Sequence, residues 1–168
     1  MEWTDTLMLD SSRNDGRSDS QRSLLAARVM TKQGITFLHA DAPTYAETTA
    51  SLELLRGFRE SVRRVVLCEG SWIAAGRQLG HEVVELGLAD VLVSCGRTGR
   101  EVGIGARDAG LDLSSVVVCN TADAGCRVLT RMLHEGDTVL LLGIEQEECD
   151  GLIESLGHCS TVKSGAAA

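Results

Sequence analysis

Short apolar runs alternate with amphipathic segments along most of this chain. Continuous hydrophobic runs are typical of strands buried on both faces, and apolar residues recurring every three to four positions indicate helices. The expected strands are 64–68, 91–95, 115–119 and 137–142, and the expected helices are 44–57, 76–87, 98–109, 122–134 and 146–156. Upstream, residues 26–31 and 35–39 flank a Lys-Gln-Gly turn and predict a β-hairpin. Residues 159–162 are a further candidate edge strand.

Strands that alternate with helices predict a parallel sheet covered on both faces. We therefore expect an α/β fold, a Rossmann-like three-layer α/β/α arrangement. Its sheet should be mostly parallel, with about six strands and an N-terminal β-hairpin.

The strand at 91–95 and the helix that follows form the most distinctive unit. Thr98 and Glu101 have the spacing of a capping box, which predicts a helix starting there, and Gly110 is expected to end it. Small residues spaced four, three and four suggest that this helix lies close on the sheet. They are Gly99, Gly103, Ala106 and Gly110.

Length and composition indicate a single domain. The chain has 168 residues, and we expect a disordered polar tail at 1–22, one domain over 23–163 and a flexible end at 164–168. The formal net charge of −8 argues against nucleic acid as a partner. The sequence shows no apolar run of membrane-spanning length and no secretory start, so we expect no membrane partner and a cytoplasmic location.

The six cysteines lack Cys-x-x-Cys spacing, which favours reduced core thiols over a metal site. A thiol-based sensor that uses Cys95 or Cys119 beside arginines remains a weaker alternative.

The loops after parallel strands meet at one edge of such a sheet, where ligands bind. His39 and Asp41 form the best acid–base pair by residue type, although Asp41 also suits a turn. Arg97 and Arg100 at a helix start could hold an anion or could simply be solvated. The full set of candidate ligand-binding residues is His39, Asp41, Trp72, Arg97, Thr98, Arg100 and Asn120. We identify no catalytic and no metal-binding residues.

Familiar phosphate-binding signatures are missing. The spacing from Cys95 to Arg100 is one residue short of a thiolate-phosphatase loop. The sequence holds no Walker-type ATP loop and no dinucleotide fingerprint.

Several sequence motifs within residues 26–156 resemble those of the C-terminal domain of the Mur ligases. Residues 89–111 resemble that domain's strand, glycine and helix ending Gly-Ala-x-x-Ala-Gly-Leu. Residues 133–143 resemble its Leu-x-x-Gly-Asp-x-Val-Leu-x-Lys-Gly. In that family, ATP binding and acyl-phosphate formation rest on a central P-loop domain, which this sequence lacks.

The functional loops depart from the family's pattern. Leu142 stands where the resemblance implies a lysine, and the loop at 39–45 lacks the family's asparagines. We therefore expect a non-catalytic binding or interaction module with a protein partner and no cofactor of its own. The alternative is the third domain of a split ligase in peptidoglycan precursor synthesis, which would use ATP and Mg through its partner domains.

Overall fold

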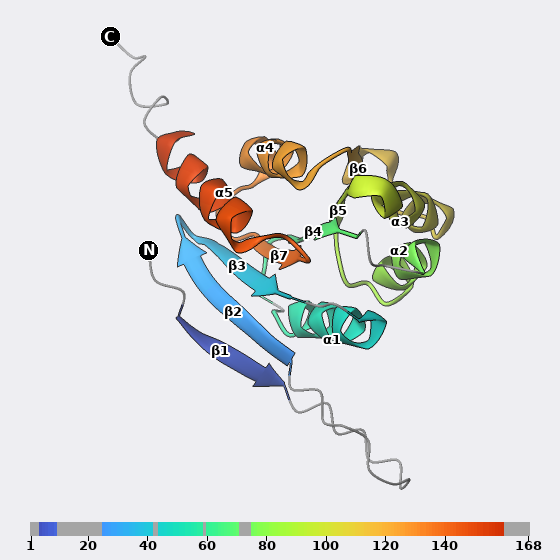
Figure 1. The fold of residues 1–168 in the computed structure, drawn as a ribbon, viewed down its shortest axis with the longest axis horizontal. Coiled ribbons are helices and arrows are strands. Elements are labelled where there is room, and N and C mark those ends of the chain that lie inside the picture. Colours follow the sequence, from blue (N-terminus) through green and yellow to red (C-terminus); the bar gives the residue numbers. More distant parts are fainter. Residues whose placement is uncertain (1–3, 10–24, 42–43, 59, 71–74, 160–168) are drawn as a thin grey trace, which may run out of the picture.

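The sheet at the centre of the protein has seven strands in the order β1-β2-β3-β7-β4-β5-β6 (Figure 1). The computed structural model describes residues 4–9, 25–41, 44–58, 60–70 and 75–159. The strands are β1 Thr4–Leu9, β2 Leu25–Lys32, β3 Ile35–Ala40, β4 Arg64–Glu69, β5 Val91–Cys95, β6 Val116–Cys119 and β7 Thr138–Leu142. The first three pair antiparallel, and β3, β7, β4, β5 and β6 run parallel. The Rossmann-like expectation is confirmed, including its hairpin.

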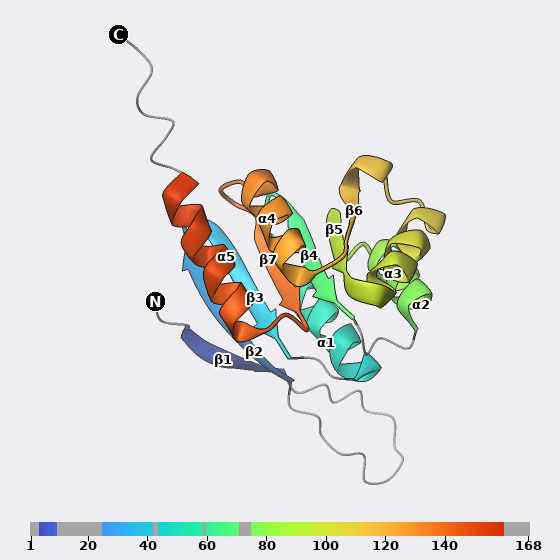
Figure 2. The same cartoon turned by 45° about the horizontal axis from the view of Figure 1, so that its top comes forward.

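Helices cover both faces of the sheet (Figure 2). They are α1 Tyr45–Arg56, α2 Gly76–Glu85, α3 Gly96–Asp108, α4 Ala122–Met132 and α5 Gln146–Cys159. Right-handed crossovers explain the sides they take. The chain moves outward from β3 to β6 through α1, α2 and α3 on one face, and it returns through α4 to β7 on the other.

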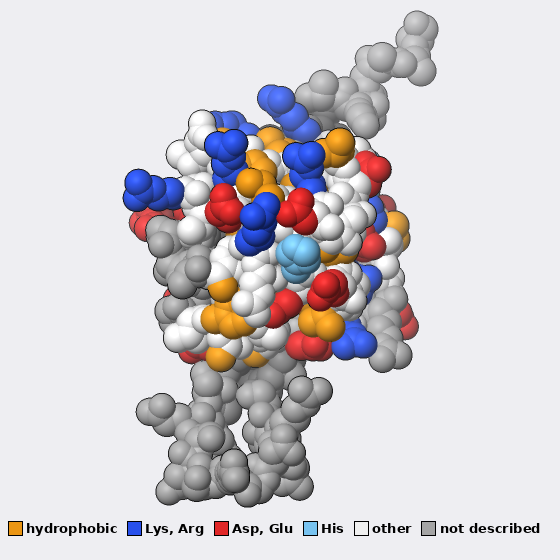
Figure 3. All heavy atoms as spheres, turned by 90° about the vertical axis from the view of Figure 1, so that its right-hand side faces the viewer, with side chains coloured by type: hydrophobic (Ala, Val, Ile, Leu, Met, Phe, Trp, Pro, Cys, Tyr) orange, Lys and Arg blue, Asp and Glu red, His pale blue; other side chains and the backbone are white. Residues whose placement is uncertain are grey.

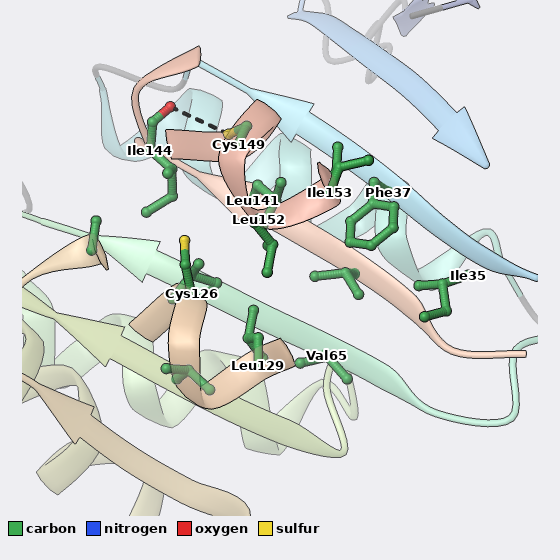
Figure 4. Close-up of a cluster of buried hydrophobic side chains, with 14 of the residues drawn as sticks. Ile35, Phe37, Val65, Cys126, Leu129, Leu141, Ile144, Cys149, Leu152 and Ile153 are labelled. Atoms are coloured by element: carbon green, nitrogen blue, oxygen red, sulfur yellow. Dashed lines mark hydrogen bonds between the residues drawn. The ribbon is translucent and has the colours of Figure 1, made fainter. Parts of the chain in front are cut away.

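The period-two alternation of each strand divides the core into two clusters. In β4, Val66 and Cys68 pack in the cluster beneath α1, α2 and α3, whereas Val65 and Leu67 pack in the cluster beneath α4 and α5. Figure 4 shows the second cluster, in which the Cys149 thiol points to the Ile144 carbonyl oxygen at 3.8 Å. Both faces of the central strands are therefore buried, as continuous apolar runs predict.

Small residues bring α3 onto the sheet, as expected. A Cβ at Gly99 would lie 2.8 Å from the Ser94 carbonyl carbon, and one at Gly103 would lie 2.7 Å from Cγ2 of Val118. Gly110 has a different role, because it has no neighbour within 4 Å of a Cβ and its φ of +102° ends the helix.

Gly80 and Gly105 form a helix–helix crossing that local sequence patterns do not reveal. A Cβ at Gly105 would overlap the carbonyl oxygen of Arg77, and one at Gly80 would overlap that of Val102. The backbones of α2 and α3 therefore touch, which explains two glycines in helix interiors where they disfavour the helix.

Strand β1 corrects part of the expected disordered tail. Residues 4–9 pair antiparallel with β2, so the sheet has seven strands rather than about six. Local composition did not reveal this strand, because a partner from another part of the chain satisfies its backbone. The rest of the predicted tail, residues 1–3 and 10–22, and residues 164–168 lie outside the described residues.

The start of α3 and the end of α5 also differ from expectation. Helix α3 begins at Gly96 with Cys95 as its N-cap, so the capping box of Thr98 and Glu101 was wrong. The φ of +76° at Gly96 turns the chain straight out of β5, and the helix begins two residues earlier. Helix α5 extends to Cys159, which corrects the edge strand expected from that residue; positions 160–162 lie outside the described residues.

Candidate functional site

The carboxyl ends of five parallel strands form one edge of the sheet. The register pairs Ala40 with Leu142, Leu142 with Cys68, and Cys95 with Cys119, so the strand-end loops are neighbours. The loop after β7 leads to α5 on one face, whereas the loops after β3 and β4 lead to α1 and α2 on the other. Such a reversal is where ligands bind in open α/β sheets.

His39 is buried beneath this edge of the sheet. Its side chain lies in β3 and the residue is only 6% exposed. Its Nε2 lies 2.9 Å from the carbonyl oxygen of Ile144, and because a carbonyl only accepts, Nε2 donates. His39 thus fastens β3 to the loop after β7, while Asp41 is exposed beyond the strand. Their proposed acid–base role stays a prediction, and the buried histidine does not favour it.

Two arginines, Arg97 and Arg100, lie in the first turns of α3. Arg97 and Arg100 are exposed, and no side chain caps this helix. The Thr98 hydroxyl is buried without a hydrogen-bond partner in the described parts of the chain. Glu69 approaches the same helix start, with Oε1 3.6 Å from the position of a Cβ at Gly96. This carboxylate favours the positive end of the helix and competes there with an external anion.

The other candidate residues lie further along the edge or outside the described structure. Asn120 is exposed directly after β6. Trp72 lies outside the described residues, so its position is not tested. The sequence therefore correctly located Arg97, Arg100 and Asn120 at the exposed edge, since strand ends can be read from the apolar runs.

Carboxylates dominate the edge between β4 and β7. Burial raises the pKa of Glu148, and the charges of Glu69, Glu145 and Asp123 raise it further. Glu69 ends β4, and Glu145 and Glu148 lie at the start of α5 after β7. These neighbouring carboxylates make this part of the edge unfavourable for anions.

The buried thiols are not activated. Burial raises the pKa of Cys68 and of Cys126 to about 12 and raises the pKa of Cys95 and of Cys149 well above the ordinary thiol value. Such thiols are protonated near neutral pH and are weak nucleophiles. Cys119 is partly exposed and lies opposite Cys95 on the neighbouring strand.

A hollow of about 520 Å³ lies between α4 and α5. Its walls carry both charge signs, with Arg127 and Arg131 on α4 and Glu147 and Glu148 on α5. Within the described residues, no group of His, Cys, Asp or Glu side chains is arranged to hold a metal ion.

The three layers and the strand-end edge define a Rossmann-like fold that can hold a ligand at its carboxyl edge. The sequence matches no family profile, and no curated protein matches it. Solved structures of Mur ligases, and of a domain from one of them, share its fold. This confirms, at the level of fold, the resemblance to the Mur ligase C-terminal domain.

Three of these structures show the extent of the likeness. A domain from a Haemophilus ducreyi protein, named as a UDP-N-acetylmuramate:L-alanyl-gamma-D-glutamyl-diaminopimelate ligase, has a TM-score of 0.58 at 14% identity, covering 76% of this chain and 95% of that one. The D-alanyl-D-alanyl-adding ligase of Acinetobacter baumannii has a TM-score of 0.55 at 15% identity, covering 77% and 28%. The murein peptide ligase of Psychrobacter arcticus has a TM-score of 0.52 at 18% identity, covering 83% and 30%.

The chain thus spans less than a third of the length of the whole ligases. At these identities the likeness shows the fold alone. No helix in the described parts of the chain is long and apolar enough to cross a membrane.

Proposed function

We propose that this chain is a binding module with the fold of a Mur ligase C-terminal domain and without catalysis of its own. The observation that carries the proposal is Leu142, the last residue of β7. It is fully buried in the core at the position where the resemblance implies a lysine. A buried leucine offers no positive charge to a phosphate, so the edge lacks a cation at this strand end.

The charge of the neighbouring loops supports the same proposal. Glu69 and Glu145 lie close enough to Glu148 that their negative charges raise its pKa. Several carboxylates at the switch between β4 and β7 repel the phosphates of ATP and of UDP-linked substrates. This arrangement disfavours the nucleotide chemistry of a ligase.

The exposed binding surface in this proposal is the rest of the edge. Arg97 and Arg100 supply cations beside the uncapped start of α3, and Asn120 and Asp41 supply polar groups at neighbouring strand ends. The Thr98 hydroxyl between the arginines is buried, so it is not part of this exposed surface. A surface with separated positive and negative regions suits a protein partner better than a nucleotide.

A split ligase is the second candidate, and the shared fold favours it. The Haemophilus ducreyi structure is a single domain from a ligase, and the match to this chain covers 95% of that domain. Under this alternative, a partner protein would bring ATP, Mg and the UDP-linked peptidoglycan precursor, and this chain would complete the active site.

Thermal unfolding with ATP–Mg, ADP and UDP-N-acetylmuramoyl peptides separates the two. A ligand at 100 times its Kd stabilises a fold by about 2.7 kcal/mol, which raises Tm by roughly 5–10 °C in a domain of this size. We expect no shift with any of the three.

A shift with a nucleotide would overturn the proposal of a module without ligase chemistry. The variant Arg97→Ser should abolish such a shift if the start of α3 binds the phosphates. Arg56→Ser is the matched control, because Arg56 is an exposed arginine at the end of α1.

A further inference from the structure

Helix α3 carries a stripe of side chains on its outer side. Arg100, Ile104 and Arg107 are spaced four and three residues apart, which places them on one side of the helix. Gly105 faces α2, and at about 100° per residue the two arginines lie roughly 140° to 200° around the helix from it. Arg100 and Arg107 therefore lie on the side away from α2, toward the free edge of the sheet at β6.

Arg100 and Arg107 are both exposed, and within the described residues neither forms an ion pair or a side-chain hydrogen bond. The arginines that do pair with a carboxylate are Arg56, Arg63, Arg64, Arg77 and Arg127. Figure 3 views the side of the molecule that carries α2 and α3, and toward its top Lys and Arg side chains gather with Asp and Glu side chains between them. A protein of net charge −8 thus exposes two arginines on α3 that pair with no described carboxylate.

Strand β6 provides an open backbone edge beside this stripe. It is the outermost strand, and no described strand pairs with its outer edge. Val118 is 48% exposed and lies against α3 at Gly103, and Leu113, in the turn leading into β6, is 66% exposed. No proline or lysine guards the strand, although such residues commonly protect an edge from pairing.

We propose that the outer edge of β6 and the α3 arginines together dock an acidic, extended segment of a protein partner. The segment would add to the sheet as an eighth strand through backbone hydrogen bonds. Alternate side chains of an extended segment point to opposite faces of the sheet. Its carboxylates would therefore lie on the α3 face beside Val118 and pair with Arg100 and Arg107, and its apolar side chains would lie on the other face. This inference rests on the proposed function as a binding module and adds the surface and the chemistry of the partner.

The same charges disfavour a second copy of this chain on the edge. Two β6 strands paired antiparallel about a twofold axis would bring the arginine stripes of two α3 helices together. Like charges across an interface oppose association.

Fluorescence anisotropy tests the proposal with a labelled peptide of alternating glutamate and valine. The control peptide has lysine in place of glutamate. We expect the acidic peptide to bind at least ten-fold more tightly, with weaker binding as salt is added. NMR amide shifts should concentrate on β6 and α3. The double variant Arg100→Gln and Arg107→Gln should lose most of the affinity, whereas Arg56→Gln should retain it.

Equal binding of the two peptides, unchanged binding by the double variant, or amide shifts confined to another edge would overturn the inference. So would a concentration-dependent dimer in sedimentation that Val118→Glu abolishes, because a second copy would then occupy the edge. The nucleotide titration is independent of these results. A rise in Tm with a nucleotide overturns the proposed function. If only the acidic peptide fails to bind, the proposed docking surface at β6 is removed and the proposed function stands.

Discussion

Arg63 donates two hydrogen bonds to the buried carboxylate of Asp137, from Nε at 3.1 Å and from Nη2 at 2.6 Å. Arg63 precedes β4 and Asp137 precedes β7, so the pair joins the starts of two central strands. The backbone N–H of His134 also donates to Asp137, and Arg63 donates to the Met132 carbonyl oxygen at the end of α4. Asp137, in the Gly-Asp motif that resembles the Mur ligases, therefore stabilises the fold by connecting β4, β7 and the end of α4.

Breaking this pair should strongly destabilise the fold. Asp137 is 1% exposed, and Arg63→Met would leave its carboxylate buried without its cation, at a cost of about 3–5 kcal/mol. Urea unfolding measures the loss. Arg64→Met is the matched control, because Arg64 pairs at 3.7 Å with the half-exposed Asp90, and it should cost under about 1 kcal/mol. Equal effects of the two variants would show that the buried pair has no special weight.

The crossing of α2 and α3 should tolerate no side chain at Gly105. Gly105→Ala forces a Cβ against the backbone of Arg77, and we expect a loss of about 2 kcal/mol or more. Gly151→Ala in α5 meets nothing within 4 Å and should instead stabilise by about 0.5–1 kcal/mol through helix propensity. Thermal unfolding of both variants gives the comparison, and a stabilising Gly105→Ala would contradict the crossing.

Thiol labelling tests the alternative of a sensor. In a Cys159→Ser background, we expect Ellman's reagent to react quickly with Cys119 alone, since it is the partly exposed member of the described cysteines. A thiol of pKa about 12, such as Cys68, is only roughly one part in 10⁵ thiolate at neutral pH. The variant Cys119→Ser should remove the fast phase. Rapid labelling of Cys95 in the native protein, or labelling of Cys119 faster than in the unfolded chain, would instead favour the sensor.

The raised pKa of Glu148 makes stability depend on pH. The folded state holds this proton more tightly than the unfolded chain, so stability falls as pH rises from the ordinary carboxyl pKa through the raised one. Glu148→Gln removes this penalty above that range. We expect Tm to rise by about 1 °C or more at neutral pH, with no gain at pH values below the ordinary glutamate pKa. Glu147→Gln on the exposed side of α5 is the control, and an equal gain there would argue against the cause given.

The strands were the most predictable part of the fold. β5 matches its expected range, and β4 and β7 differ from theirs by one residue. A strand buried on both faces must be apolar throughout, so its limits are visible in the sequence. The start of α3 was less predictable, because the backbone of Gly96 rather than a capping side chain decides it.

The candidate site was only partly predictable. Exposure of Arg97 and Arg100 follows from their position at a strand end, and the structure agrees. The burial of His39 could not be foreseen, because its cover is the loop at Ile144, more than a hundred residues away in the chain. The closeness of Glu69 to Glu148 could not be foreseen for the same reason, because the two residues are far apart in the chain.

The sequence by itself determined the elements, the layers and the direction of the parallel strands, because hydrophobic periodicity and chain connectivity act locally. Only the tertiary structure decided that β7 lies between β3 and β4, that Gly80 meets Gly105, and that β6 is the outermost of the described strands. These relationships depend on contacts between distant segments, whose free energies no local pattern records.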